Sequence, residues 1–386
     1  MTIEEHKTIP VPHVEERTPI PTQNLRVPGP TPLPPEVMAA QAAPMINHRG
    51  PEFSAMAKRV TLRLQYFFQT EALVLTYPSA GTGGQECAIV NLFSPGDHVV
   101  SITIGNFGDR MAKIASSYGL EVTRLEFPWG QAARPEIVDE RLQGLAPYRG
   151  VLLTHNETST GVTNDIQALA QVIRRHNPEA LIVVDAVSSL SSIPLDMDAW
   201  GLDVVFSGSQ KGWMSPPGIM MIAASERAWE ANKSAKLPRF YFDWEKTRKQ
   251  LVTRWQHPTT PAVSVFYALD VALELMLKEG REAIFERHAR AGEYVRGRAK
   301  AMGLDLFADP AYASNTVTAL KVPEGIDIKA VLKRLREEDK VVFAGGQAHY
   351  EGKIFRIGHL GYFTMTDLEQ AMDALEKQLR VSGFRG

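Results

Sequence analysis

Val204–Trp213, with the sequence VVFSGSQKGW, is a short apolar strand that runs into small residues and then into one lysine. The preceding stretch, Ala180–Val187, has the sequence ALIVVDAV and is a continuous apolar run that contains one acid. Such runs are typical of central strands in a parallel sheet that is covered on both faces. Because parallel sheets bind ligands beyond the carboxyl ends of their strands, we expect Asp185 and Lys211 to lie at the same edge.

A lysine and an aspartate at one sheet edge suit pyridoxal phosphate. The lysine amine condenses with the cofactor aldehyde, and the aspartate keeps the pyridine nitrogen protonated so that the ring can accept carbanion electrons. A lysine after a strand is otherwise most often a solvated loop residue. The acid on the preceding strand favours the chemical interpretation.

A glycine-rich turn upstream offers a place for the cofactor phosphate. Leu73–Tyr77 is an expected strand, residues 78–86 read PSAGTGGQE, and an apolar helix is expected to begin near Cys87. Free N–H groups and the positive end of a helix dipole favour a phosphate at such a place. Alone, the glycines are better explained by an ordinary tight turn. Together with Asp185 and Lys211, they favour a cofactor site.

Five motifs in this order resemble the class V aminotransferases, and most closely the alanine–glyoxylate and serine–glyoxylate aminotransferases. The motifs are SAGTG at 79–83, HNETSTG at 155–161, DAVSS at 185–189, SQK at 209–211 and RIG at 356–358. The resemblance extends from about Leu25 to the C-terminus. It implies an α/β fold, that of the fold type I pyridoxal-phosphate transferases, with a large doubly wound domain on a mixed, mostly parallel sheet and a smaller C-terminal α+β domain. It also implies a homodimer whose site is shared across the interface.

The resemblance assigns the cofactor site residue by residue. The implied set is Lys211 and Asp185 as catalytic groups, Gly81, Thr82 and Gly83 around the phosphate, Phe107 against the ring, Thr158 at the ring hydroxyl, Gln210 at the phosphate, and Thr259 at the phosphate of the partner protomer. The family often has Trp where this chain has Phe107, and a smaller ring can still stack. Thr260 remains an alternative to Thr259, and serines and threonines in such loops also serve simply as helix caps.

The substrate residues implied by the resemblance are Arg356 and Gly29. A guanidinium stays charged and can hold a carboxylate with two parallel hydrogen bonds. Arg356 lies in an expected strand and matches the substrate-carboxylate arginine of the family, although a surface ion pair would explain most arginines. Gly29, in the sequence PGP, would allow close approach to the substrate. No metal ligand is expected in this site.

Hydrophobic periodicity predicts a regular alternation of strands and helices. The expected strands are 98–105, 121–127, 151–155, 181–187, 204–207 and 219–223, followed by 316–322, 341–344 and 354–357, and the expected helices are 53–67, 109–118, 166–176, 262–278, 281–301, 328–339 and 366–379. We expect an extended arm over 1–45, because its prolines fix φ and remove donors. The large domain is expected over 46–280 and the small domain over 281–386.

The composition of the chain limits its partners and location. It has 386 residues, 44% of them hydrophobic, and a formal net charge of −2, which is enough chain for two domains. Nothing in this balance suggests binding to nucleic acid or to a membrane surface. The single cysteine excludes an intrachain disulfide. The start lacks the pattern of a secretion signal and no apolar run is long enough to cross a bilayer, so a cytoplasmic location is expected.

The expected activity is ping-pong transamination from a small amino acid, alanine or serine, to a small 2-oxo acid such as glyoxylate. An (S)-ureidoglycine–glyoxylate aminotransferase remains an alternative, because one methyl or hydroxyl group discriminates too little to be read from sequence. A cysteine desulfurase or related lyase needs a mobile nucleophilic cysteine, and Cys87 is expected behind the phosphate turn. A dinucleotide-binding oxidoreductase requires a third glycine where Glu86 stands. A non-catalytic protein of this fold would show a damaged site, and none of the site positions looks damaged.

Overall fold

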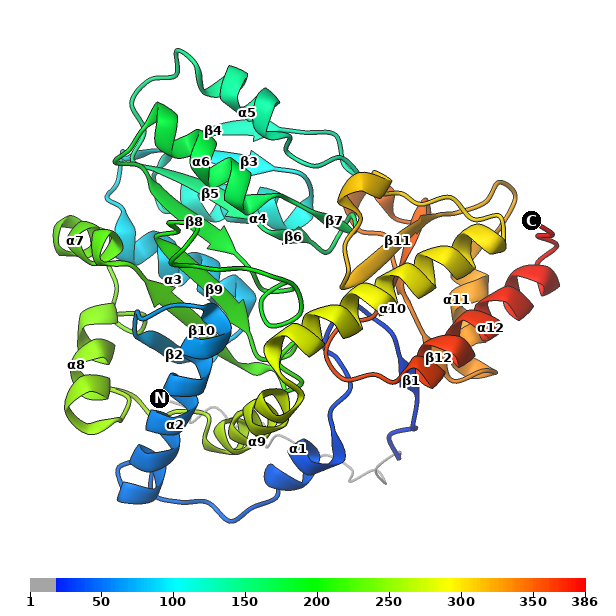
Figure 1. Ribbon diagram of the computed structural model, residues 1–386, viewed down its shortest axis with the longest axis horizontal. Coiled ribbons are helices and arrows are strands. Elements are labelled where there is room, and N and C mark those ends of the chain that lie inside the picture. Colours follow the sequence, from blue (N-terminus) through cyan, green and yellow to red (C-terminus); the bar gives the residue numbers. More distant parts are fainter. Residues whose placement is uncertain (1–18) are drawn as a thin grey trace, which may run out of the picture.

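The computed structural model describes residues 19–386 and shows a larger body and a smaller C-terminal body, with the long helix α10, Arg281–Ala301, running between them (Figure 1). The larger body contains a seven-stranded sheet in the order β2-β10-β9-β8-β5-β3-β4. Its strands are β2 (Val74–Ser79), β3 (His98–Thr103), β4 (Glu121–Glu126), β5 (Gly150–Thr154), β8 (Leu181–Asp185), β9 (Val204–Gly208) and β10 (Gly218–Ala224). Strand β10 is antiparallel to both neighbours, and the other pairs are parallel. The predicted mixed, mostly parallel sheet is confirmed.

Helices cover both faces of this sheet, as a doubly wound arrangement requires. The helices of the larger body are α2 (Pro51–Phe68), α3 (Gly81–Leu92), α4 (Asn106–Ser117), α5 (Pro135–Leu142), α6 (Ile166–His176), α7 (Glu226–Ser234), α8 (Trp244–Arg254) and α9 (Val263–Glu279). Apolar residues of α2, α5, α6 and α9 form one core with one face of the sheet, and those of α3, α4, α7 and α8 form a second core with the other. The strands are therefore apolar on both faces, which explains their continuous Val, Ile and Leu runs.

Two helices begin earlier than their sequences predict. Helix α3 begins at Gly81 rather than near Cys87, so the glycine-rich segment is its first turn and not a loop before it. Helix α4 begins at Asn106 rather than at Asp109, because the buried carboxylate of Glu157 accepts hydrogen bonds from the first N–H groups of the helix. In both cases contacts from distant residues outweigh local helix propensity.

The C-terminal body has a core of its own. It contains the antiparallel sheet β11-β14-β13, in which β11 is Val317–Lys321, β13 is Ala344–Gly345 and β14 is Ile354–Gly358. Helices α10, α11 (Ile328–Glu337) and α12 (Met365–Val381) contribute to this core. The predicted single strand 341–344 is wrong. It divides into β12 (Val341–Val342) and β13, because the two halves pair with different neighbours, the N-terminal arm and β14.

The N-terminal arm is only partly extended. Residues 1–18 lie outside the described residues. Beyond them, β1 (Asn24–Leu25) pairs in parallel with β12 of the C-terminal body. A short helix α1 (Pro35–Ala40), not expected from the proline content, begins at Pro35, where the fixed φ of proline suits the first helical position. Val37 of α1 packs on α9.

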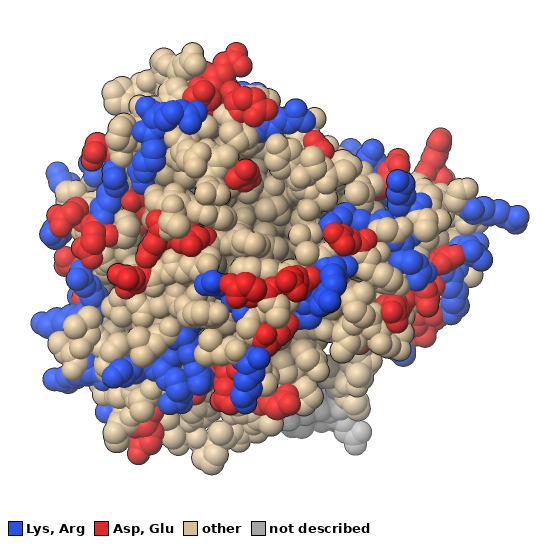
Figure 2. Space-filling view, in the orientation of Figure 1, with Lys and Arg blue, Asp and Glu red and all other residues tan. Residues whose placement is uncertain are grey.

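The visible surface carries mixed charge. Figure 2 shows acidic and basic side chains interspersed over most of this face, with basic side chains gathered at the lower left, where Figure 1 places α8. The sequence of α8 contains Lys246, Arg248, Lys249 and Arg254. Among the described residues, no helix combines the length and the apolar character that a membrane span requires.

Candidate active site

The amine of Lys211 is held at the edge of the sheet by the N-terminal arm. Lys211 follows β9 and is partly buried, and its Nζ donates a hydrogen bond of 2.5 Å to the carbonyl oxygen of Pro28. Gly29 has a φ of +121°, and a Cβ there would lie within 2.8 Å of the Lys211 side chain. The predicted close approach at Gly29 is therefore an approach to the lysine. Burial, with the charge of Arg356, lowers the pKa of Lys211 to about 8.

Asp185 lies at the carboxyl end of the neighbouring strand. It ends β8, which pairs with β9, and only 4% of its surface is exposed. Burial raises the pKa of Asp185 to about 6, while hydrogen bonds from the Val187 N–H (3.0 Å) and from Gln85 Nε2 (2.8 Å) oppose this rise. Lys211 follows β9, the parallel neighbour of β8, and the negative charge of Asp185 opposes the lowering of the Lys211 pKa. The structure thus brings this predicted pair to one sheet edge.

The first turn of α3 is an uncapped helix N-terminus made of closely packed glycines. No side chain caps the helix. A Cβ on Gly83 would lie 1.9 Å from Ser79 Oγ, and one on Gly81 would lie 2.6 Å from the Val187 side chain. A Cβ on Gly208, at the end of β9, would lie near both Gln210 Oε1 and the Gly81 N–H, so Gln210 lies at this helix end. Free N–H groups and the helix dipole together favour an anion here.

Phe107 lies in the first turn of α4, beside the start of α3. The guanidinium of Arg110 lies 4.9 Å from the Phe107 ring centroid, and its Nη1 donates to Thr82 Oγ1 at 3.2 Å. Arg110 therefore ties the two helix starts together. Sequence reasoning missed Arg110, although its position one turn after Phe107 was a usable signal.

Thr158 is buried and its hydroxyl already has a protein partner. Thr158 Oγ1 donates to Ser188 Oγ at 2.7 Å, and the amide of Asn156 donates to the same oxygen at 2.8 Å. The Thr158 oxygen keeps lone pairs that can accept a hydrogen bond, so this geometry is compatible with the role predicted for Thr158 at a ring hydroxyl. Ser188 and Gln85 are further polar groups that sequence reasoning missed, because no periodicity marks a side chain that supports another.

Arg356 is a buried guanidinium on the central strand of the C-terminal sheet. It is 5% exposed, its Nε donates to the Gly345 carbonyl at 3.0 Å, and its Nη1 donates to the Thr158 carbonyl at 3.1 Å. Within residues 19–386, no carboxylate lies within 4.0 Å of its guanidinium nitrogens. Burial lowers the pKa of Arg356 to about 10, so it stays charged at neutral pH.

Thr259 lies in the loop before α9, directly after two residues that Arg49 contacts. The guanidinium of Arg49 donates to the carbonyl oxygens of His257 and Pro258, the latter at 3.1 Å. Thr259 is partly exposed and Thr260 is exposed. No hydrogen bond of either hydroxyl is present in the described part of the chain, so neither residue caps α9, which begins at Val263.

Cys87 is buried in α3 and is unsuited to nucleophilic chemistry. Trp244 Nε1 donates to its sulfur at 3.2 Å, and burial raises the pKa of the thiol far above its ordinary value. The thiol is therefore protonated and inaccessible. This is the structural role expected from the sequence.

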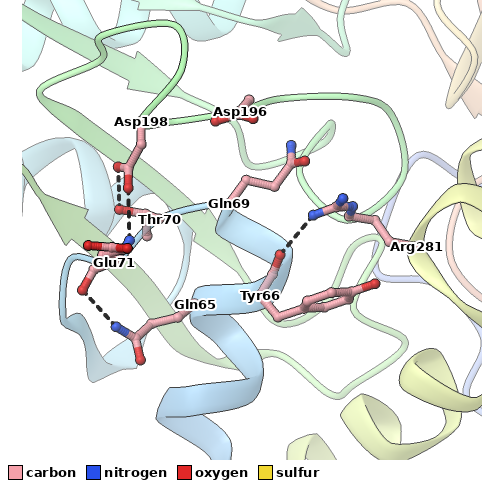
Figure 3. Close-up of a pocket in the computed structure, with 8 residues that line it drawn as sticks. All are labelled: Gln65, Tyr66, Gln69, Thr70, Glu71, Asp196, Asp198 and Arg281. Atoms are coloured by element: carbon pink, nitrogen blue, oxygen red, sulfur yellow. Dashed lines mark hydrogen bonds between the residues drawn. The ribbon is translucent and has the colours of Figure 1, made fainter.

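A surface depression of about 670 Å³ lies near the C-terminal end of α2 and contains none of the predicted site residues (Figure 3). Its lining residues are Gln65, Tyr66, Gln69, Thr70, Glu71, Asp196, Asp198 and Arg281. Asp198 accepts hydrogen bonds from the Thr70 hydroxyl and the Glu71 N–H, and Arg281 donates to the Tyr66 carbonyl. These polar groups already have hydrogen-bond partners within the protein, so we do not assign a ligand to the depression.

The residues of the candidate site fit pyridoxal phosphate. Lys211 supplies an amine with a lowered pKa, and Asp185 supplies a buried acid supported by Gln85. The first turn of α3 supplies glycines that leave no room for side chains, and Gln210 Oε1 is buried without a hydrogen-bond partner among the described residues. An amine, an acid and an anion site are the groups that this cofactor requires.

Comparisons with known proteins show the family of the chain. The chain matches the family "Aminotransferase class-V" over residues 27–369. It is 42% identical over 362 residues to a Synechococcus protein called soluble hydrogenase, small subunit, covering 93% of this chain and 94% of that one. It is 40% identical over 342 residues to the L-aspartate–glyoxylate aminotransferase of Paracoccus denitrificans, covering 88% and 86%.

A solved structure shows the fold. An alanine–glyoxylate aminotransferase from Nostoc sp. has a TM-score of 0.90 to this chain at 31% identity, covering 98% of this chain and 100% of that one. The match confirms the predicted fold type I architecture, and the family match confirms the predicted resemblance. The chain belongs to the class V aminotransferases, a family of pyridoxal-phosphate enzymes.

Proposed function

We propose that this protein transfers an amino group from alanine or serine to glyoxylate, with pyridoxal phosphate bound at Lys211. The two aminotransferases compared above carry glyoxylate in their names, which supports it as the acceptor. The donors differ between those names, so the donor rests on the compact site around Gly29 and Lys211. (S)-Ureidoglycine remains the second candidate donor.

The observation that carries this proposal is the buried, charged guanidinium of Arg356 near the amine of Lys211. A buried charge is costly unless a partner neutralises it. Arg356 has only carbonyl partners among the described residues, so its charge is available to an anion from outside the chain. The carboxylate shared by amino acids and 2-oxo acids meets this requirement.

The chain's own residues divide the work of transamination. Pyridoxal phosphate, when bound, supplies an aldehyde that condenses with amines and a ring that withdraws electrons from the substrate Cα. Arg356 holds the substrate carboxylate and thereby fixes the direction of the Cα–H bond. Lys211, with a pKa of about 8, has a free-amine fraction near neutral pH and takes the Cα proton as general base. Asp185 holds the proton on the ring nitrogen.

The same residues serve both halves of a ping-pong cycle. After the first keto acid leaves, Arg356 binds the carboxylate of the second, and Lys211 returns a proton to its Cα. Because donor and acceptor use one arginine in turn, they compete for the same site. Substrate inhibition by glyoxylate at high concentration is the kinetic consequence.

We further propose that the site is shared in a homodimer, with Thr259 reaching the phosphate bound by the partner protomer. The partial exposure of Thr259 and the anchoring of its loop by Arg49 support this role. We also propose that the chain divides into an arm (1–45), a large domain (46–280) and a small domain (281–386). We propose a cytoplasmic location for the protein.

An absorbance spectrum of the purified protein tests the proposal. Alanine, serine or ureidoglycine should bleach the yellow band of the bound cofactor, and glyoxylate should restore it. Lys211→Ala should lose the band and nearly all turnover, whereas Lys249→Ala, which removes a surface lysine of α8, should change neither. Bleaching by none of these donors, or normal turnover in Lys211→Ala, would contradict the proposal.

A further inference from the structure

Two series of contacts connect Arg356 with the start of α4, where Phe107 lies, and one of them passes through Gln347. In the first series, Arg356 donates to the Thr158 carbonyl. The hydroxyl of the next residue, Ser159, accepts a hydrogen bond of 3.0 Å from the N–H of Asn106, which directly precedes Phe107. In the second series, Arg356 donates to the Gly345 carbonyl. Gln347, two residues further along the chain, accepts a hydrogen bond from the side chain of Asn106. Gln347 therefore lies between the carboxylate-binding arginine and the residue assigned to the cofactor ring.

The side chain of Gln347 is held by one end only. Its Oε1 accepts from Asn106 Nδ2 at 3.4 Å. Its Nε2 has no hydrogen-bond partner among residues 19–386. An amide that uses only its oxygen in this way keeps two N–H donors free for another acceptor.

The backbone around Gln347 is fixed against the large body. Trp129, in the loop after β4, stacks on Tyr350 with ring centroids 5.5 Å apart, and Phe307 meets the same tyrosine at 4.6 Å. Gln347 itself precedes the short helical turn Ala348–Tyr350, and its carbonyl accepts from the Tyr350 N–H at 3.0 Å. Aromatic packing of this kind makes the position of Gln347 reproducible, as recognition requires.

We propose that Gln347 recognises the side chain of the amino donor and favours donors whose side chain carries an acceptor oxygen. Serine and aspartate have such an oxygen and alanine does not. The substrate class is thus polar or acidic small amino acids, with alanine as a poorer donor. This inference rests on the proposed function, because it takes Arg356 as the carboxylate site.

The chemistry of the neighbourhood agrees with an acceptor oxygen. Arg356 and Arg110 are close enough to Lys211 for their charges to lower its pKa, so positive charge exceeds negative charge around the amine. Glu157, a buried acid whose charge raises the pKa of Arg356, already accepts hydrogen bonds from backbone N–H groups of α4. N–H donors and an excess of cations favour an oxygen acceptor over a methyl group.

Two variants of Gln347 and one control test this role. Gln347→Met keeps the length of the side chain and removes both donors, so kcat/KM for serine and aspartate should fall about 10- to 100-fold while that for alanine changes little. Gln347→Glu replaces the donors with a negative acceptor. It should exclude aspartate more strongly than serine, because the serine hydroxyl can donate to it. Gln370→Met, an exposed glutamine on α12, should leave all three donors unchanged.

A binding measurement separates this inference from the proposed function. Succinate carries a second carboxylate and butyrate does not, so succinate should bind the resting enzyme more tightly, and Gln347→Met should abolish the difference. Calorimetry measures this without turnover. An equal loss for all three donors in a folded Gln347→Met protein, or an unchanged preference for succinate, would overturn the role of Gln347. If the unmodified enzyme reacts with none of the donors but still binds succinate more tightly than butyrate, the result counts against the proposed reaction and not against the role of Gln347.

Discussion

Lys211 is the residue whose chemistry depends most on its surroundings. The folded protein lowers its pKa from 10.5 to about 8 because the amine is desolvated. Below pH 8 the amine is protonated in both states, but the charge is poorly solvated only in the folded state. The folded state is therefore destabilised relative to the unfolded chain in this pH range. Between pH 8 and 10.5 the unfolded chain binds more protons than the folded one, so the contribution of Lys211 to the free energy of unfolding rises with pH.

Replacement of Lys211 by Met should therefore stabilise the cofactor-free protein. At pH 7 the gain in the free energy of unfolding should be up to about 3 kcal/mol, reduced by the partial solvent exposure of the side chain. The gain should disappear as the pH rises from 8 to 10.5. Chemical denaturation at pH 7 and pH 10 measures it, and a gain independent of pH would show that methionine packing, not the titration of the amine, is responsible.

Some site residues could be predicted because the apolar strand before each of them indicates where its reactive group lies. Asp185 ends an apolar run and Lys211 follows another, so both could be assigned to one sheet edge from strand composition. Gln85 and Gln347 could not be found in this way. Their importance comes from contacts with residues far along the chain, Asp185 and Asn106, and no local pattern records such a contact.

At the scale of elements, the first turn of α3 depends on the absence of side chains. A Cβ on Gly83 would lie 1.9 Å from Ser79 Oγ and 3.1 Å from Ser79 Cβ. Either the helix start or the end of β2 must move if residue 83 has a side chain. The expected consequence is a displaced anion site and not a disrupted core, because Gly83 is only partly buried.

Gly83→Ala should weaken pyridoxal phosphate binding by about 10-fold or more, consistent with the loss of well-placed hydrogen bonds to an anion. The unfolding midpoint of the cofactor-free protein should change much less. Adding Ser79→Ala removes the closest clashing atom, so the double variant should recover part of the affinity. Fluorescence titration measures each dissociation constant. No recovery in the double variant would mean that the hydroxyl of Ser79 is itself needed for binding.

The beginnings of helices were the least predictable feature of the elements. Glycine has low helix propensity, so residues 81–84 read as a turn, yet packing against Val187 and Phe206 makes them helical. The central strands were predicted more accurately, because they are buried on both faces and therefore appear in the sequence as continuous apolar runs. The separation of β12 from β13 was not predictable, since both halves have similar apolar composition and differ only in their partners.

At the scale of the whole molecule, the proposed sharing of the site between protomers has a specific consequence. If Thr259 serves the partner's phosphate, a dimer of one Lys211→Ala chain and one Thr259→Val chain contains one site with both defects and one with neither. Refolding the two variants together should restore cofactor affinity and turnover above those of either variant alone. Hybrids of Lys211→Ala with Thr260→Val serve as the control. Turnover equal to the average of the parents would contradict a shared site.

The pairing of β1 with β12 joins parts of the chain that a ribosome makes at very different times. The arm carries Pro28, which holds the amine of Lys211, but the arm is fixed in place by a strand near the end of the chain. While the chain is being made, the arm has no strand to pair with, and Arg356 has not yet been added. Residues 24 and 25 therefore reach their place in the fold only after nearly all of the chain has been made.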